Sequence, residues 1–560
     1  KIADAGEGLT NGAIIASSPV WSNGTASITL STSSGLTIQY QKGGISGSWT
    51  TGTNVTGLHH RDTVFARLTD GKNYGGEASI TILDTVAPQD AGISLSGTST
   101  TTAGSVTAKV TLKDNESGVN VTASKWVYNT NSGNIGTNES SYNNNFSSNG
   151  QTITLKATTA GTYYLHVLTV DNAGNKNETI SSAVTVEKAL VADGSYNDEK
   201  GVNTPNIGSG MTPIKWNGSS WVETTGSDKD WYDYTAKKWA NAKTSDGSMW
   251  VWIPRYAYNI TSGYHSNTVG NIEIEFMKGL TDETSTGRTS FQNASGQGNW
   301  NIHPAFNYGQ TVSGLWVAKF EASNSGGKIK VEPGVSSWRY NHIGSMYTNC
   351  INYNSVLNSH MMKNDEWGAV AYLSKSKYGK QNEEVWINNS SCCITGSAGN
   401  SVSASKDTGT TNDYTSTQGV KASTTGTVYG IYDMSGGAIE YVAAYVNNAD
   451  DSLTKYGSSL VNGEAKTKNV YNVGGSSGGH KIDYNANSAK YGDAVYETSE
   501  NGWTNNKSWY NDYSYFPTGS LPFFGRGGGY SYDTITGVFY FSNSAISYNN
   551  NSFRPVLVAL

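Results

Sequence analysis

The first 188 residues contain a series of short stretches in which apolar and polar side chains alternate, and turn residues close each stretch. Successive side chains of a strand point to opposite faces, so this alternation builds a sheet with one buried face. Short strands separated by Gly, Asn and Asp are typical of β-sandwiches. The predicted strands lie at residues 26–32, 36–41, 63–68, 106–112, 152–157, 163–170 and 183–186.

The chain is too long, at 560 residues, for one ordinary domain. A linker with the sequence D-T-V-A-P at residues 84–88 separates the first strands from the later ones. We therefore predict sandwiches at residues 1–87 and 88–188 and a different domain at 189–560. Tyr40 and Trp49 are predicted as core or cross-strand aromatics of the first sandwich.

Two short motifs of this region resemble the bacterial Ig-like repeats of surface proteins. They are the D-T-V-A-P link at residues 84–88 and the D-N-A-G-N-K turn at residues 171–176. The resemblance implies Ig-like sandwiches that serve as a stalk, holding a working domain away from the cell. A generic β-sandwich without a known role is the alternative.

The amino-acid composition changes after residue 188, where Trp and Tyr become frequent. Buried aromatic strands are predicted at residues 249–258 and 314–321. One helix is predicted at residues 364–379, with Asn364 or Asp365 as its cap and Gly379 just past its end. The Gly/Ser/Thr/Asn-rich residues 391–427 are predicted as a long irregular loop.

The segment from residue 510 to residue 560 contains no Lys, Glu, Gln, Met or Trp, although all five occur upstream. It is built largely from Tyr, Ser, Asn, Gly, Thr and Phe, a composition that resembles that of an antibody paratope. The five missing types are also those that no codon ending in C encodes. Targeted rewriting through such codons would produce this composition, and chance in an Asn/Ser/Gly-rich chain is the alternative.

Four stretches, taken in order, resemble the formylglycine-generating-enzyme/sulfatase-modifying-factor superfamily. They are W-I-P-R-Y at 252–256, M-K-N-D-E-W-G-A-V-A-Y-L at 362–373, Y-G-I-Y-D-M-S-G-G-A-I-E-Y-V at 429–442, and R-G-G-G-Y at 526–530 followed by S-F-R-P-V-L at 552–557. The resemblance covers residues 189–560 and implies a loop-rich α+β head with a C-type-lectin-like fold. The expected fold class is therefore mostly β, with two Ig-like β-sandwiches followed by this head.

The resemblance is closer to a branch from gut Firmicutes and their phages, whose heads end in a hypervariable tract. In that branch a diversity-generating retroelement mutates adenines, so that AAC-type codons become any codon ending in C. This mechanism matches the codon rule inferred from the missing residue types. Some members carry a prepilin-like segment, which implies display on a pilus.

The enzymes of the superfamily place a Cys pair just after the R-G-G motif for copper-dependent oxidation. Residues 526–541 contain no Cys, and Tyr or Thr cannot replace a thiolate nucleophile or a soft copper ligand. No H-E-x-x-H metalloprotease motif occurs. The residues around Ser531 do not match G-x-S-x-G, the motif that presents a nucleophilic serine on a tight turn. We therefore expect no catalytic residue and no enzymatic activity.

Few metal or disulfide sites are expected. Many relatives bind calcium near the stretch that corresponds to residues 429–442, where Glu440 matches the acidic position but Gly437 replaces Asn. A structural Ca²⁺ at Glu440 is the one cofactor that the resemblance leaves open. Cys350 can pair with either Cys392 or Cys393, which would leave one free thiol.

Constant and variable positions of the C-terminal tract can be separated on physical grounds. A special turn is predicted at Arg526–Gly527–Gly528 and a core strand at 537–541, whereas residues 529–536 and 543–551 are predicted as exposed loops. Phe553, Val556 and Leu557 should be buried, with Arg554 paired to a carboxylate, while Phe523 and Phe524 can border the surface or belong to the core. The predicted ligand-binding residues are Gly529, Tyr530, Ser531, Tyr532, Asp533, Thr534, Ile535, Asn543, Ser544, Ile546, Tyr548, Asn549 and Asn550.

The functional hypothesis is a surface-displayed adhesin or receptor-binding protein whose partner is a protein or glycan on another surface. The net charge of −6 and the absence of a Lys/Arg cluster argue against nucleic acid, and no apolar run suits a membrane span. The chain starts without Met or a signal sequence, so we expect a processed or truncated extracellular form. The alternatives are a structural filament, pilus or phage-fibre subunit, and an enzyme with unrecognised chemistry.

Overall fold

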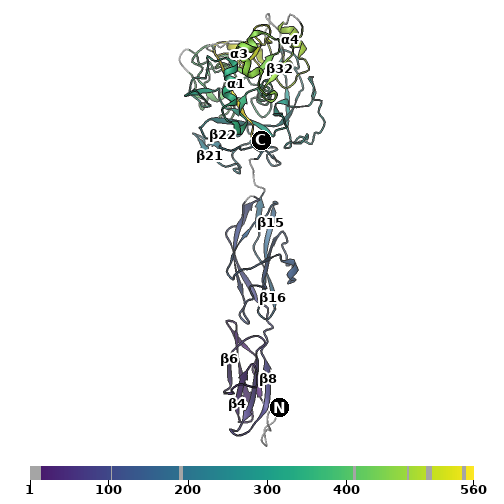
Figure 1. Cartoon of the computed structure of the whole chain (residues 1–560), viewed down its shortest axis with the longest axis vertical. Helices are drawn as coiled ribbons and strands as arrows, with labels where there is room; N and C mark the ends of the chain where they lie inside the picture. The colour runs from purple at the N-terminus through teal and green to yellow at the C-terminus, as the bar shows by residue number, and fades with distance from the viewer. Residues whose placement is uncertain are drawn as a thin grey trace. The chain divides into compact units, whose positions relative to one another are not determined.

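The computed structural model describes residues 14–102, 104–187, 193–407, 411–475, 479–499, 507–544 and 550–560. The chain divides into two compact units, Lys1–Ala189 and Leu190–Leu560, both drawn in Figure 1. We call the second unit the head. Strand is the dominant secondary structure of the described residues in both units, which confirms the mostly β class. Among these residues, no helix combines the length and apolar composition that crossing a bilayer requires.

The first unit begins with a sandwich of two sheets. One sheet pairs β3 with β1, β2 and β6, and the other has the order β5-β4-β7-β8. Alternate residues of β3 and β7, such as Ile28, Leu30, Val64 and Leu68, fill the core between the sheets. The strands are β1 Ile14–Ala16, β2 Val20–Ser22, β3 Thr25–Thr32, β4 Thr37–Lys42, β5 Thr50–Thr51, β6 Asn54–Leu58, β7 Thr63–Thr69 and β8 Tyr74–Thr81.

A second sandwich follows with its own core. The sheet β14-β11-β9 faces the sheet β10-β17-β15-β12-β13, in which β16 also pairs β15. Strand β11 alternates as the sequence predicts, with Val106, Ala108, Val110 and Leu112 buried. The strands are β9 Gln89–Leu95, β10 Ser99–Thr101, β11 Val106–Lys113, β12 Lys125–Asn129, β13 Asn144–Asn145, β14 Thr152–Leu155, β15 Gly161–Val170, β16 Lys176–Ile180 and β17 Val184–Glu187.

The head contains a large sheet with the order β21-β20-β22-β23-β27-β36-β30. Its central strands are buried on both faces, and Trp250, Trp252 and Trp316 pack within them. Strand β36, near the C-terminus, lies between β27 and the edge strand β30. The strands are β20 Met211–Trp216, β21 Trp221–Glu223, β22 Asn241–Thr244, β23 Met249–Pro254, β27 Gly314–Ala318, β30 His360–Met361 and β36 Pro555–Leu557.

The strand predicted at 249–258 is two strands in different sheets. Strand β23 ends at Pro254, and β24 Tyr256–Ile260 pairs instead with β25 Ile272–Phe276 and β26 Asn301–Ile302. The break falls at Arg255, whose buried guanidinium donates to the Thr281 carbonyl at 2.6 Å and to Asp282 at 2.7 Å. The residues on both sides of Arg255 are almost all apolar or aromatic, so no period-2 alternation marks where one sheet ends and the next begins.

A second head sheet has the order β32-β31-β33-β34, and β35 also pairs β31. This sheet carries both segments of the tract predicted to bind ligand. Its strands are β31 Ile439–Val446, β32 Asn469–Tyr471, β33 Phe523–Arg526, β34 Phe541–Ser544 and β35 Asn551–Phe553.

The α-helices of the described residues lie in the head, where Figure 1 labels α1, α3 and α4. The predicted helix is α2; it begins at Asn364 as predicted, but its N-cap is Lys363 and it ends at Ser374 instead of continuing towards Gly379. The Ser374 and Ser376 hydroxyls donate to the carbonyls of Ala371 and Leu373, and these bonds satisfy the end of the helix. The four helices of the described residues are α1 Ile343–Ile351, α2 Asn364–Ser374, α3 Asp451–Val461 and α4 His480–Ala486.

Candidate ligand-binding site

The pairing of β33 with β34 brings the two parts of the tract together. Phe523 pairs with Ser544 and Arg526 with Phe541, so residues 527–540 leave the sheet and return to its edge as one loop. Strand β35 runs parallel to β31, and the Ile439 N–H donates to the Asn550 carbonyl at 2.6 Å. Segments far apart in sequence therefore meet beside Ile439.

The Arg526–Gly527–Gly528 turn has the special conformation that the sequence predicts. Gly527 and Gly528 have φ values of +79° and +73°, a region that favours glycine. The Arg526 guanidinium is fully buried and donates to Asn364 Oδ1 at 3.0 Å and to the Asp493 carbonyl at 3.2 Å. Burial lowers the pKa of Arg526 to about 10, which still leaves it charged near neutral pH. The turn is thus tied to α2 and fixes where the loop starts.

A cavity of about 460 Å³ lies where the two segments meet. We call it the tyrosine cavity, because Tyr513, Tyr532 and Tyr540 contribute three of its side chains. The Tyr540 ring lies 5.5 Å from that of Tyr513 and 6.3 Å from that of Tyr532. The lining is Ile439, Tyr513, Tyr532, Ile535, Tyr540, Ser542, Asn543, Ser544, Asn550 and Asn551.

The tyrosine cavity is uncharged. Among the described residues, no Lys, Arg, Asp or Glu lines it. Burial raises the pKa of Tyr540 and of Tyr513, so both phenols stay neutral at physiological pH. Apolar ring faces and Ile side chains alternate with amides and hydroxyls, the composition of a site for an uncharged polar ligand.

A second cavity of about 510 Å³ lies on the other side of the same loop. We call it the polar cavity, since its lining is almost entirely hydroxyl, amide and charged groups. Lys406 Nζ lies 5.9 Å from the centre of the Tyr530 ring, which connects this cavity to the tract. The lining is Asn389, Asn400, Ser401, Ser403, Ala404, Ser405, Lys406, Asp407, Asp533 and Thr534.

The predicted ligand-binding residues divide into several groups in the structure. Tyr532, Ile535, Asn543, Ser544 and Asn550 line the tyrosine cavity, and Asp533 and Thr534 line the polar cavity. Ser531 is exposed and Tyr530 half-buried, whereas Gly529 is buried beneath Ile439 and Tyr532. Ile546, Tyr548 and Asn549 lie outside the described residues.

The predicted boundary between strand and loop is wrong. Residues 538–540 are buried but form a turn, and β34 begins only at Phe541. The Asp512 carboxylate accepts from the Phe539 N–H at 2.8 Å and holds this turn. Asn543 and Ser544 therefore belong to a strand, and Ser544 is buried, with its hydroxyl 2.7 Å from that of Tyr441. Asn551, predicted in the exposed loop, is likewise buried in β35.

Sequence reasoning missed several lining residues. Tyr540 was assigned to the core strand, and Tyr513 and Ile439 were not assigned to the site. Tyr513 lies within the compositionally biased segment, so that bias could have indicated it. Ile439 is placed by the pairing of β31 with β35, which no local pattern encodes. Phe523 and Phe524, for which both roles were open, belong to the core.

The residues that follow the tract are fixed as predicted. Phe553, Val556 and Leu557 are buried, and the Arg554 guanidinium donates to both carboxylate oxygens of Glu440. Glu440 is thus the partner of a buried arginine. This geometry gives no support to calcium at Glu440, which stays a prediction.

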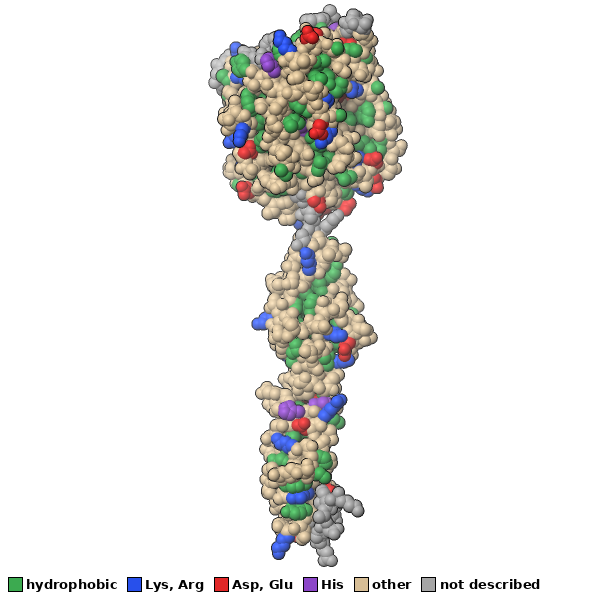
Figure 2. All heavy atoms as spheres, viewed as in Figure 1, with side chains coloured by type: hydrophobic (Ala, Val, Ile, Leu, Met, Phe, Trp, Pro, Cys, Tyr) green, Lys and Arg blue, Asp and Glu red, His purple; other side chains and the backbone are tan. Residues whose placement is uncertain are grey.

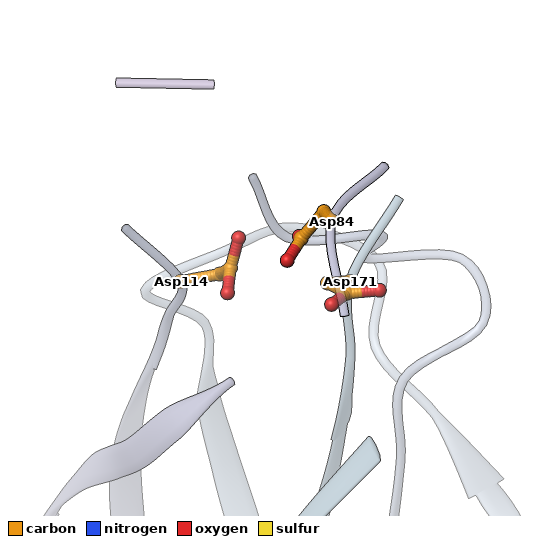
Figure 3. A group of neighbouring side chains, drawn as sticks. All are labelled: Asp84, Asp114 and Asp171. Carbon is orange, nitrogen blue, oxygen red and sulfur yellow. The ribbon is translucent and has the colours of Figure 1, made fainter. Parts of the chain in front are cut away.

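An acidic cluster in the first unit has the oxygen chemistry that suits a hard cation such as Ca²⁺. Carboxylate oxygens of Asp84, Asp114 and Asp171 lie within 4.8 Å of one another, and Figure 3 shows the three carboxylates close together. Backbone N–H groups of Ser117 and Gly118 donate to Asp84 and Asp114 at 3.0 and 2.6 Å. Burial, and next the neighbouring carboxylates, raise the pKa of Asp114 to about 6.

The cysteines form no disulfide. Cys350 and Cys393 are buried free thiols and Cys392 is an exposed one, so neither of the two pairings that the sequence left open for Cys350 is formed. Burial raises the pKa of Cys350 and of Cys393, to about 12 for the latter, which keeps both thiols protonated. None of the three is among the described residues that line the tyrosine or polar cavity.

Charged side chains are dispersed on the head. Figure 2 shows Lys and Arg in blue and Asp and Glu in red as scattered groups on the face in view, between larger areas of polar uncharged surface. The tract at residues 510–560 continues this pattern, because its only charged side chains are two Asp and two Arg. The tract therefore offers ring faces and uncharged hydrogen-bonding groups more than charges.

No family model matches the chain, and no curated protein matches it. Among solved structures it is similar to the FN1–FN3 domains of chicken CNTN1, at 10% identity over 48% of this chain and 85% of that one, with a TM-score of 0.18. Fibronectin(III)-like modules of Clostridium thermocellum CbhA match at 13% identity over 31% and 94%, with a TM-score of 0.14. Murine CEACAM1b matches at 13% identity over 31% and 99%, with a TM-score of 0.18. With TM-scores this low, these structures give no information about function, so the function is inferred from the site.

Proposed function

We propose that this protein is a non-enzymatic, surface-displayed adhesin or receptor-binding protein, whose C-terminal tract binds a ligand. The head would have a C-type-lectin-like fold of the formylglycine-generating-enzyme type, and the sandwiches would be Ig-like domains that carry it. The tract would be diversified by a retroelement acting on its codons.

One observation carries this proposal. Five residues chosen from the sequence as variable, Tyr532, Ile535, Asn543, Ser544 and Asn550, line one cavity although they come from two separate segments. Strands also contribute to its lining, through Ile439 of β31 and residues 542–544 of β34. A rigid scaffold that carries exchangeable polar and aromatic contacts is the arrangement of a binding face.

The binding role can be tested on intact cells. The full-length protein, fluorescently labelled, is incubated with a panel of bacterial strains and read by flow cytometry. Replacing both Tyr530 and Tyr532 by Ala should abolish staining of any strain that the parent protein stains, with little change in melting temperature, since both rings are only half-buried. The matched control is Tyr340→Ala, because Tyr340 is exposed on another part of the head and lines neither cavity.

Unchanged staining by the double variant would contradict the proposed binding face. A large fall in melting temperature would show instead that the two rings act as core. Diversification is tested separately by sequencing clonal isolates and the neighbouring genes. A near-identical template repeat, a reverse transcriptase gene and substitutions confined to the predicted variable codons are expected, and uniform drift along the gene would contradict it.

A further inference from the structure

The polar cavity is bounded by a loop that is itself held rigidly. The Asn389 carbonyl accepts from the Asp407 N–H at 2.8 Å, and Asn389 Nδ2 donates to the Ser405 carbonyl at 2.8 Å. Asn412 Nδ2 donates to Asn400 Oδ1 at 2.9 Å and to two backbone carbonyls of the same loop. These bonds close residues 389–407 into a structured loop outside the variable tract.

One buried acceptor on this loop receives no hydrogen bond from any residue that the structure describes. Asn389 is only 7% exposed, and within the described ranges its Oδ1 accepts no hydrogen bond although Nδ2 is bonded. Leaving a buried acceptor unsatisfied costs about 1–3 kcal/mol. Asn389 lines the polar cavity, so this unsatisfied oxygen belongs to a residue of the cavity wall.

The two cavities share a wall. The 3₁₀ turn Asp533–Ile535 presents Asp533 and Thr534 to the polar cavity and Ile535 to the tyrosine cavity. On the polar side the Lys406 ammonium lies 5.9 Å from the Tyr530 ring. A ligand that crosses this turn would contact the variable tract and the loop at residues 389–407 together.

We propose that residues 389–407 form a fixed subsite beside the variable tract and that the ligand is a neutral glycan. This inference rests on the proposed function, since it names the chemistry of the same binding face. Sugar hydroxyls both donate and accept, which matches the polar cavity, where Ser and Asn side chains mix with Lys406 and Asp533. The less polar faces of sugar rings match the rings of Tyr532, Tyr540 and Tyr513 in the uncharged cavity.

The test uses the full-length protein on an array of neutral oligosaccharides printed beside unmodified peptides. Ser403→Trp fills the polar cavity from an exposed position, and Lys406→Ala removes its one ammonium group. The matched control is Ser459→Trp, an exposed serine of α3 that lines neither cavity. Tyr532→Ala reports on the tyrosine cavity. The parent should bind oligosaccharides, and the two polar-cavity variants should bind at least about tenfold more weakly, while Ser459→Trp should bind as the parent does.

Each other result overturns the inference in a distinct way. If Ser403→Trp and Lys406→Ala bind oligosaccharides as the parent does while Tyr532→Ala loses binding, the fixed subsite is wrong and the proposed function stands. If the parent binds peptides and no oligosaccharide, the glycan class is wrong, and loss of peptide binding by Tyr532→Ala would again support the proposed function. If the parent binds neither set, the glycan inference fails, and the cell-staining experiment decides the proposed function independently.

Discussion

Buried charged residues differ in the partners that the fold gives them. Arg554 has the Glu440 carboxylate and two backbone carbonyls. Lys319, fully buried, donates to Asn241 Oδ1 and to the Val428 and Gly430 carbonyls. Asp114 lies beside two other carboxylates, and no described Lys or Arg pairs with it. The first two residues are therefore expected to be structural, whereas Asp114 should be a source of instability.

Removing one partner of a buried ion pair leaves the other charge unpaired. We expect Arg554→Ala to lower the free energy of unfolding of the head by about 3–5 kcal/mol, because Glu440 is then buried alone. Urea denaturation followed by Trp fluorescence measures the loss. Lys377→Ala, an exposed lysine of the head, is the control and should change stability little. A loss below about 1 kcal/mol for Arg554→Ala would contradict the role given to this pair.

The pKa of Asp114, raised to about 6 from 3.8, predicts a pH dependence. Its favourable contribution to folding is complete below about pH 4 and is lost as the pH rises through about 6. In EDTA, Asp114→Asn should therefore increase hydrogen-exchange protection of β9–β17 at pH 7, and the gain should shrink towards pH 4. Asp533→Asn, an exposed change in the head, should not alter these strands. Lower protection at pH 7 would show that the Asp114 carboxylate is compensated in the folded state.

The elements differ in how far local sequence specifies them. Strands β3, β7 and β11 follow the alternation of their residues, because each has one face on a core. In the head, β23, β27 and β31 are buried on both faces, and α2 is buried along its whole length. Such elements carry no periodic signal, so their ends and their partners are set by packing.

The glycine turn that starts the binding loop gives a prediction at this scale. In Gly528→Ala the new Cβ would lie 2.9 Å from Thr536 Oγ1 in a backbone with φ +73°. Gly519 has φ +56°, and a Cβ added there would have no atom within 4 Å. Gly519→Ala should therefore lower the free energy of unfolding only by the cost of the left-handed backbone conformation, about 1–2 kcal/mol. Gly528→Ala should cost about 1–3 kcal/mol more, from overpacking. Urea denaturation compares the two, and equal losses would show that Thr536 does not restrict the turn.

The whole molecule consists of two units with separate cores. The cluster that includes Trp250, Trp316 and Phe553 lies wholly within the head, and the clusters of the sandwiches lie wholly within Lys1–Ala189. Each unit therefore buries its own apolar surface and should fold by itself.

Independence of the head is measurable by calorimetry. A protein that starts at residue 190 should show a melting transition at the temperature of the head transition in the full chain, because none of the described residues in its core belongs to the first unit. It should also retain any staining of cells that the full chain shows. A shift of more than a few degrees in the head transition would mean that the sandwiches stabilise the head.

The sequence by itself determined the mostly β class, most strands of the two sandwiches and the special Arg526–Gly527–Gly528 turn. It also indicated which residues of the tract to predict as ligand-binding. Alternation, glycine conformation and composition act locally, so they can be read from neighbouring residues. Tertiary structure alone decided that Ile439 and Asn389 lie beside that tract and that Asn543 and Ser544 are in a strand. These placements depend on β31, β33, β34 and β35 pairing across long sequence separations, and such pairing is decided by burial of the whole head.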